Sequence, residues 1–167
     1  MKTETKKIVT TALLAALICI ATMMIKIPSP LKGYLNLGDG FVLVAGWILS
    51  PFYGLLAAGI GSALADIFAG YTVYAGATFL IKGGMALACH FIFQSLSKHL
   101  SALWSRILSG VIAEIIMVGG YYLFEGFLYG FEVSLVNILP NAMQGFAGIL
   151  VGVLLIKALE KSLPTFE

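Results

Sequence analysis

Long apolar stretches alternate with short polar breaks along nearly the whole chain. The apolar runs cover residues 8–25, 40–65, 76–97, 105–124 and 137–158. A helix needs about 20 predominantly apolar residues to cross the hydrocarbon core of a bilayer, and most of these runs have that length. The pattern therefore predicts an all-α integral membrane protein that crosses the bilayer several times.

The run at 40–65 is interrupted in its middle by the sequence Ser50-Pro51-Phe52-Tyr53-Gly54. Since proline and glycine interrupt helices, this run is either one kinked helix or two helices joined by a tight turn. Its first half is short for a full crossing. The preceding polar stretch, Lys26 to Gly40, contains two prolines and is predicted to be an ordered loop.

The positions of lysine and arginine decide between these arrangements, because cytoplasmic loops of membrane proteins collect basic residues. With six helices, one side of the membrane receives Lys2, Lys6, Lys7, Lys98, Arg106, Lys157 and Lys161. With five helices, the 98–106 loop and the C-terminal end, with their basic residues, would lie on the opposite side of the membrane from the N-terminal lysines. We therefore predict a six-transmembrane-helix bundle with both termini cytoplasmic. The single membrane domain, 1–167, is expected to have helices at about 8–25, 38–50, 52–70, 76–97, 105–124 and 137–160.

Composition supports this class and argues against others. The chain is 60% hydrophobic and 11% charged, whereas soluble domains carry about 25% charged residues. The net charge of +2 comes with no basic tract longer than Lys6-Lys7, so no nucleic-acid partner is expected. The sequence has no phosphate-binding loop, metal-ligand spacing or nucleophile motif. We expect no catalytic residue, no metal and no cofactor.

Several polar side chains nevertheless fall inside the predicted helices. An ionisable residue at the centre of a membrane helix costs about 2.5–3.5 kcal/mol on insertion scales, so each one needs a partner or a function. The outer halves of the predicted helices hold Lys82, Glu114, Tyr121, Asn137, Asn141 and Gln144. The predicted loop from Lys26 to Gly40 adds Asn36 and Asp39. The three amides of the last helix share one face.

Each of these residues also has a purely structural interpretation. Lys82 would extend to the outer surface beside Asp66 or Glu125. Glu114 would stay neutral, or pair with Lys82 or His90, and the amides would bond between helices. Because the polar faces lie at similar depth, we favour an outward-facing pocket for a small polar molecule. Aromatic walls would stack on its ring, and the polar groups would orient it.

Three blocks of the sequence resemble the S components of energy-coupling factor (ECF) transporters. These blocks are Tyr34–Gly40, Gly59–Asp66 and Ala77–Gly83. The first helix also carries Ala12-Leu13-Leu14-Ala15-Ala16, which looks like the A-x-x-x-A motif of that family. The resemblance spans nearly the whole chain, including its length and its six-helix layout.

The resemblance implies a vitamin-binding membrane subunit in the plasma membrane of a bacterium. In that family it associates with a transmembrane coupling subunit and two cytoplasmic ATPases, and it topples within the membrane to carry its ligand inward. Ala12 and Ala16 would form the face against the coupling subunit, since small residues permit close helix contact. The alternative is that they pack only within the bundle.

The resemblance and the chemistry together give a set of expected substrate-binding residues: Asn36, Asp39, Lys82, Glu114, Tyr121 and Asn141. The closest resemblance is to members for hydroxymethylpyrimidine or pyridoxine, and riboflavin and thiamine are the alternatives. A carboxylate such as Glu114 would pair with an aminopyrimidine or a pyridinium N–H. An intramembrane enzyme or a self-sufficient carrier remains a further alternative. The missing catalytic motifs and internal repeat argue against both.

Overall fold

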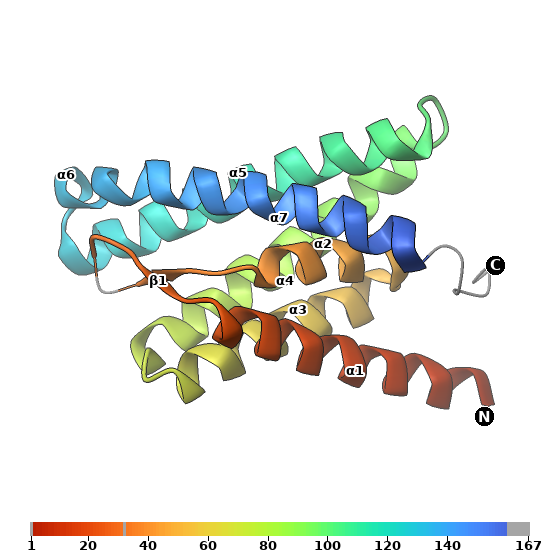
Figure 1. Cartoon of the computed structure of the whole chain (residues 1–167), viewed down its shortest axis with the longest axis horizontal. Coiled ribbons are helices and arrows are strands. Elements are labelled where there is room, and N and C mark those ends of the chain that lie inside the picture. The colour runs from red at the N-terminus through yellow and green to blue at the C-terminus, as the bar shows by residue number, and fades with distance from the viewer. Residues whose placement is uncertain (1, 32, 160–167) are drawn as a thin grey trace.

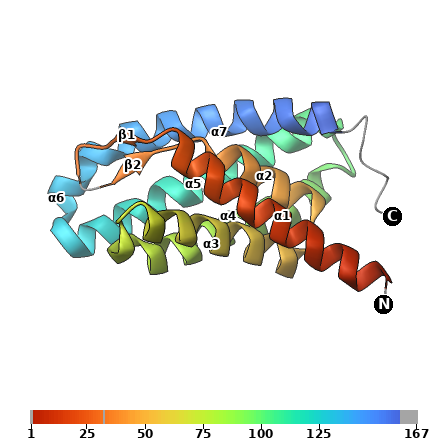
Figure 2. The ribbon, with the colours of Figure 1, turned by 60° about the horizontal axis from the view of Figure 1, so that its bottom comes forward.

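The computed structural model describes residues 2–31 and 33–159, and most of them are helical. The elements are α1 (Lys2–Met24), β1 (Ile27–Pro28), β2 (Tyr34–Leu35), α2 (Gly38–Ile48), α3 (Pro51–Phe68), α4 (Thr72–Leu96), α5 (Ala102–Tyr129), α6 (Phe131–Ser134), a 3-10 turn (Leu135–Asn137) and α7 (Ile138–Leu159). The long helices lie side by side in one bundle (Figure 1, Figure 2). Strands β1 and β2 pair antiparallel, so the fold is nearly, but not entirely, α-helical.

The interrupted run at 40–65 forms two helices, α2 and α3, which run in opposite directions (Figure 1). Pro51 begins α3, where the first turn needs no backbone N–H and the fixed φ of proline suits the helix. Five helices, α1, α3, α4, α5 and the α6–α7 stretch, are long and apolar enough to cross a membrane. The 11-residue α2 is shorter than a crossing requires.

Other helix ends also differ from the prediction. Helix α1 begins at Lys2 rather than at residue 8, so the charged residues of the N-terminal tail belong to its first turns. Helix α5 continues past Glu125 and ends at Tyr129. The residue that follows it is Gly130, whose φ of 98° favours glycine. Residue 160, the predicted end of the last helix, and Lys161 lie outside the described residues.

Helix α2 lies at the centre of the bundle, in contact with α1, α3, α4, α5 and α7. Most of its residues are buried, and Val42, Leu43 and Ala45 have no exposed surface. The indole N–H of Trp47 donates to Ser109 Oγ of α5 at 3.0 Å. A helix that is apolar on all sides is stable where other helices surround it. The short α2 therefore forms the protein core instead of facing lipid along its length.

Small residues bring the backbones of α1 and α3 together. A Cβ atom added at Gly61 of α3 would lie 2.5 Å from the carbonyl oxygen of Ala15 in α1. Since the obstructing atom belongs to the backbone, a side-chain rotation cannot relieve the contact. Gly61 thus sets the distance between the two helices, as small residues do at membrane helix interfaces.

Replacing Gly61 by alanine is expected to lower the free energy of unfolding by about 1–3 kcal/mol, because the helices must separate. Gly76→Ala is the matched control, since Gly76 is exposed on α4 and a Cβ there meets open space. That control should raise stability by about 0.5–1 kcal/mol. Thermal unfolding in detergent measures both variants. Equal melting temperatures would contradict the close approach of α1 and α3.

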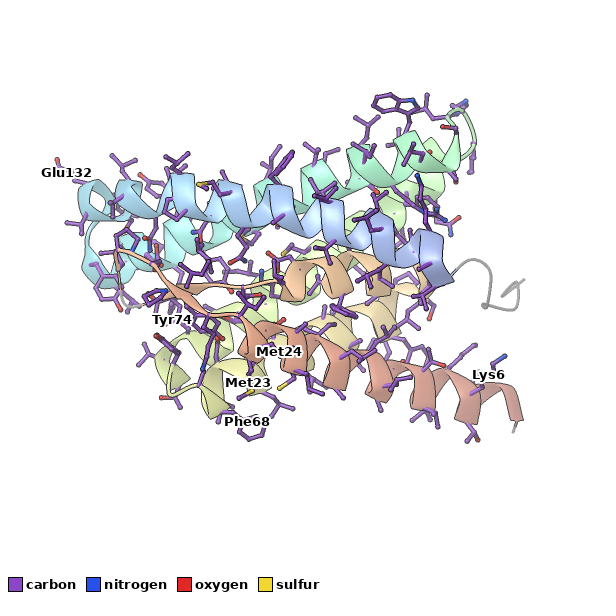
Figure 3. The ribbon with its side chains drawn as sticks, viewed as in Figure 1. Lys6, Met23, Met24, Phe68, Tyr74 and Glu132 are labelled. Atoms are coloured by element: carbon purple, nitrogen blue, oxygen red, sulfur yellow. The ribbon has the colours of Figure 1, made fainter. Side chains whose placement is uncertain are left out.

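The two ends of the bundle differ in charge. Helix α1 begins, and α7 ends, at the end where α4 and α5 are joined (Figure 1). The described basic residues of this end are Lys6, Lys7, Lys98, Arg106 and Lys157. The β1–β2 hairpin and α6 lie at the opposite end. Figure 3 shows Lys6 at the first end, and Tyr74 and Glu132 at the other.

Candidate ligand-binding site

A small polar cavity of about 30 Å³ lies at the end of the bundle that carries the β1–β2 hairpin. Its walls come from the 25–37 segment, the last turns of α3, the first turns of α4, the outer part of α5 and the beginning of α7. The polar lining consists of four tyrosines (Tyr34, Tyr71, Tyr74, Tyr121), two acids (Asp66, Glu125), three amides (Asn36, Asn141, Gln144), Ser29 and Thr78. Five separate segments of the sequence therefore build one polar site.

The tyrosines give the cavity flat aromatic walls with polar tips. The rings of Tyr34 and Tyr71 lie 4.8 Å apart at an interplanar angle of 50°. Tyr74 is held edge-on against Phe124, with 5.3 Å between ring centres. The hydroxyls of Tyr121 and Thr78 share a hydrogen bond of 3.0 Å.

Asp66, in the last turn of α3, faces the 25–37 segment. The Tyr34 hydroxyl donates to Asp66 Oδ1 at 2.8 Å. Burial, with the adjacent Asp66 carboxylate, raises the pKa of Tyr34, so its hydroxyl keeps the proton that it donates. The side chain of Asp66 is buried, and its second oxygen, Oδ2, makes no hydrogen bond with any described residue.

Glu125 of α5 has a fuller set of donors. The Asn137 side-chain amide donates to both of its oxygens, at 2.9 and 3.0 Å, and the Tyr74 hydroxyl donates at 3.3 Å. The Asn137 carbonyl in turn accepts from the Leu31 N–H at 3.5 Å. Glu125 thereby links α4, α5 and the 3-10 turn before α7 to the 25–37 segment.

A buried ion pair lies deeper in the bundle than the cavity and contacts its lining residue Gln144. Lys82 of α4 pairs with Asp39 of α2, and both side chains are almost fully inaccessible. Gln144 of α7 donates to Asp39 Oδ2 at 2.6 Å and accepts from the Asn36 N–H at 2.9 Å. Gln144 therefore joins the 25–37 segment to the ion pair.

Three of the six predicted binding residues, Asn36, Tyr121 and Asn141, line the cavity. Asp39 and Lys82 lie deeper, with Lys82 Nζ 5.5 Å from the centre of the Tyr121 ring. The partner of Lys82 is thus Asp39, and neither Asp66 nor Glu125 pairs with it in the described part of the chain.

Glu114 is not among the residues that line the cavity. It lies two helical turns before Tyr121 on α5, about 10 Å deeper. Its carboxyl group approaches the positions of Gly145 and Gly148 on α7. Both of its oxygens are buried without a hydrogen bond to any residue that the structure describes.

Asp66 and Glu125 are not among the six predicted binding residues, whereas the structure places both acids on the cavity wall. Each acid follows an apolar run at the outer end of a helix and has tyrosines nearby in the sequence, at Tyr71, Tyr74 and Tyr121. That association of acid and tyrosine was the available signal.

A second surface lies along α1. Ala12 and Ala16 are exposed there and line an apolar groove between α1 and α3. Its opposite wall is formed by Leu56, Ile60, Leu64 and Phe68. The predicted interface alanines therefore face the outside of the bundle, and the groove shares no lining residue with the cavity.

Comparisons with known proteins agree with this architecture. A sequence model of the family described as "ECF-type riboflavin transporter, S component" matches residues 2–161. A protein of Pyrococcus woesei, described as "Uncharacterized protein in gap 3'region", is 33% identical over 137 residues, which are 81% of this chain and 88% of that one.

Two solved structures are similar over nearly their whole lengths. The S component of a bacterial ECF transporter superposes with a TM-score of 0.74 at 27% identity, covering 95% of this chain and 97% of that one. An S component for biotin gives a TM-score of 0.74 at 18% identity, covering 97% and 94%, which shows the shared fold. The chain belongs to the S components of ECF-type transporters, the vitamin-binding membrane subunits of these importers.

Proposed function

We propose that this S component captures a small one-ring vitamin or vitamin precursor, with hydroxymethylpyrimidine or pyridoxine favoured. The observation that carries the proposal is the set of tyrosines, acids and amides that line one polar cavity at this end of the bundle. The space inside it is about 30 Å³, room for one or two water molecules, so a one-ring ligand would enter only when the 25–37 segment moves outward. Aromatic walls suit a flat ring, and amides and acids suit its amino and hydroxymethyl groups.

The charge of the bundle ends supports an outward-facing site. Basic residues gather where α1 begins and α7 ends, and such residues mark the cytoplasmic side. With that orientation, both termini are cytoplasmic and the cavity opens towards the outside of a bacterial plasma membrane. The short α2 then passes through only part of the bilayer within the bundle.

Delivery requires partners in this proposal, because the sequence carries no phosphate-binding loop of its own. A transmembrane coupling subunit and two cytoplasmic ATPases would supply the energy. The S component would topple against the coupling subunit and release its ligand inside. The exposed Ala12 and Ala16 on α1 offer the close-packing surface that such a contact needs.

The predicted binding residues divide by position. Asn36, Tyr121 and Asn141 would contact the ligand directly. Asp39 and Lys82 would act through Gln144, which holds Asn36 in place. Glu114 would pack against Gly145 and Gly148 of α7, deeper in the bundle than the cavity, and would not touch a one-ring ligand.

Riboflavin is the second candidate, because the matching family model carries its name. Its three fused rings and polyol chain need more room than a single ring, so the 25–37 segment would have to move outward. Thiamine is a third candidate, whose permanent positive charge would meet Asp66 and Glu125.

Equilibrium binding to the detergent-purified chain tests the proposal. Hydroxymethylpyrimidine or pyridoxine is expected to bind one-to-one with a submicromolar Kd and without ATP, whereas pantothenate should not bind. Tight binding of riboflavin alone would replace the proposed ligand. Silence across a panel of vitamins, from protein that melts cooperatively, would contradict the capture role.

A further inference from the structure

The charges around the cavity point to a more specific ligand chemistry. We infer that Asp66 anchors the ligand and that the site selects rings carrying a protonated nitrogen or an amino group, while it rejects ligands with a phosphate or carboxylate group. This inference rests on the proposed function, because it concerns the same cavity.

The lining of the cavity is acidic. It contains the two carboxyl groups of Asp66 and Glu125 and four tyrosines, and no lysine, arginine or histidine of the described chain is part of it. The neighbouring cation, Lys82, is already paired with Asp39 and approaches the Tyr121 ring. An anionic ligand would therefore add a negative charge without a cation to balance it.

Asp66 is the acid with the weaker set of donors. Glu125 already receives hydrogen bonds from Asn137 and Tyr74. Asp66 receives one well-formed bond, from Tyr34, and no described group forms a hydrogen bond with its buried Oδ2 atom. The Thr78 hydroxyl, which shares a hydrogen bond with Tyr121, is the nearby donor that also interacts with this carboxyl group. Leaving a buried carboxylate oxygen unpaired is costly, so an N–H donor in the cavity gains the full strength of a charge-assisted bond.

The aromatic walls favour the same ligand. Tyr34 and Tyr71 lie in ring contact, and Tyr34 also holds Asp66 through its hydroxyl. The face of an aromatic ring carries negative charge and attracts cations. A flat heterocycle packed against these rings can donate an N–H to Asp66 Oδ2. Aminopyrimidines and pyridinium rings have this combination of shape and charge.

A ligand series with wild-type protein tests the inference directly. Hydroxymethylpyrimidine is compared with the analogue in which hydroxyl replaces the 4-amino group, and pyridoxine with pyridoxine 5′-phosphate. The amino compound is expected to bind at least about 10-fold more tightly than its hydroxyl analogue, because it gains a charged hydrogen bond to Asp66. The phosphate ester is expected to bind about 100-fold more weakly than the alcohol, because its negative charge finds no cation in the cavity.

The matched variants are Asp66→Asn and Glu132→Gln. Asp66→Asn keeps the shape of the side chain and should weaken binding of the amino compound about 10- to 100-fold, while removing its advantage over the hydroxyl analogue. Glu132→Gln makes the same charge change on exposed α6 at the same end of the bundle and should leave binding unchanged.

The outcomes separate this inference from the proposed function. If the wild type binds a vitamin but Asp66→Asn binds it equally well, or if a phosphate ester binds as tightly as its alcohol, the inference fails and the capture role stands. If no vitamin binds to folded wild-type protein, both fail. Should Asp66→Asn not fold, the wild-type ligand series still decides.

Discussion

Replacing Lys82 by methionine is expected to remove most of the folded protein. The substitution leaves Asp39 buried in the centre of the bundle with Gln144 as its remaining described partner. Breaking a buried ion pair from one side costs about 3–5 kcal/mol, because an uncompensated charge remains. Most domains have a total stability of only about 5–15 kcal/mol. The yield of monodisperse protein in detergent and the melting temperature measure the loss.

A second substitution should restore much of that loss. In the double variant Asp39→Asn, Lys82→Met, the pair is neutral and the asparagine carbonyl can still accept from Gln144. The double-variant cycle isolates the coupling between the two residues. Lys157→Met, at the exposed end of α7, is the control for loss of one positive charge. If Lys82→Met folds normally and loses only ligand binding, Lys82 contacts the ligand and the structural role is wrong.

Replacing both Ala12 and Ala16 by leucine is expected to abolish transport while ligand binding stays within about twofold of wild type. Both alanines are exposed on α1 and line a groove that shares no lining residue with the cavity. Leucine side chains there would keep another helix from approaching closely. They disturb no residue of the binding site, and their apolar surface remains compatible with lipid.

Uptake into proteoliposomes with the coupling subunit and ATPases, together with binding to the isolated chain, measures the two effects separately. Ala142→Leu provides a control, since Ala142 is exposed on α7 in the groove between α5 and α7. It should retain both activities. Intact transport by the double variant would remove the proposed coupling role of the alanines, and loss of binding would indicate that the substitution disturbs the fold.

The helices could be predicted because the cause of each one is local. Apolar runs bounded by charges define α1, α4, α5 and α7, and the Ser50-Pro51 pair marks the division between α2 and α3. The amide stripe of the last helix was predictable from helical spacing alone. Its side chains do face inward, at Asn137, Asn141 and Gln144.

The pairing of polar groups could not be predicted in the same way. Asp39 and Lys82 lie on different helices, and their contact depends on the central position of α2, which the length of its apolar run does not reveal. Asp66 and Glu125 lie in outer helical turns, where a charge is ordinary. Their role in the cavity depends on how the 25–37 segment folds back over them, and that path is set by contacts between distant residues.

The amides of α7 also restrict how such a protein can vary. Asn137, the last residue of the 3-10 turn before α7, accepts from Leu31, and Gln144 of α7 accepts from Asn36, so two points seven residues apart hold one segment. Inserting or deleting a single residue between them would rotate one amide by about 100° relative to the other. Chains that share this attachment therefore have to keep the length of the helix here and change the ligand by exchanging side chains at fixed positions.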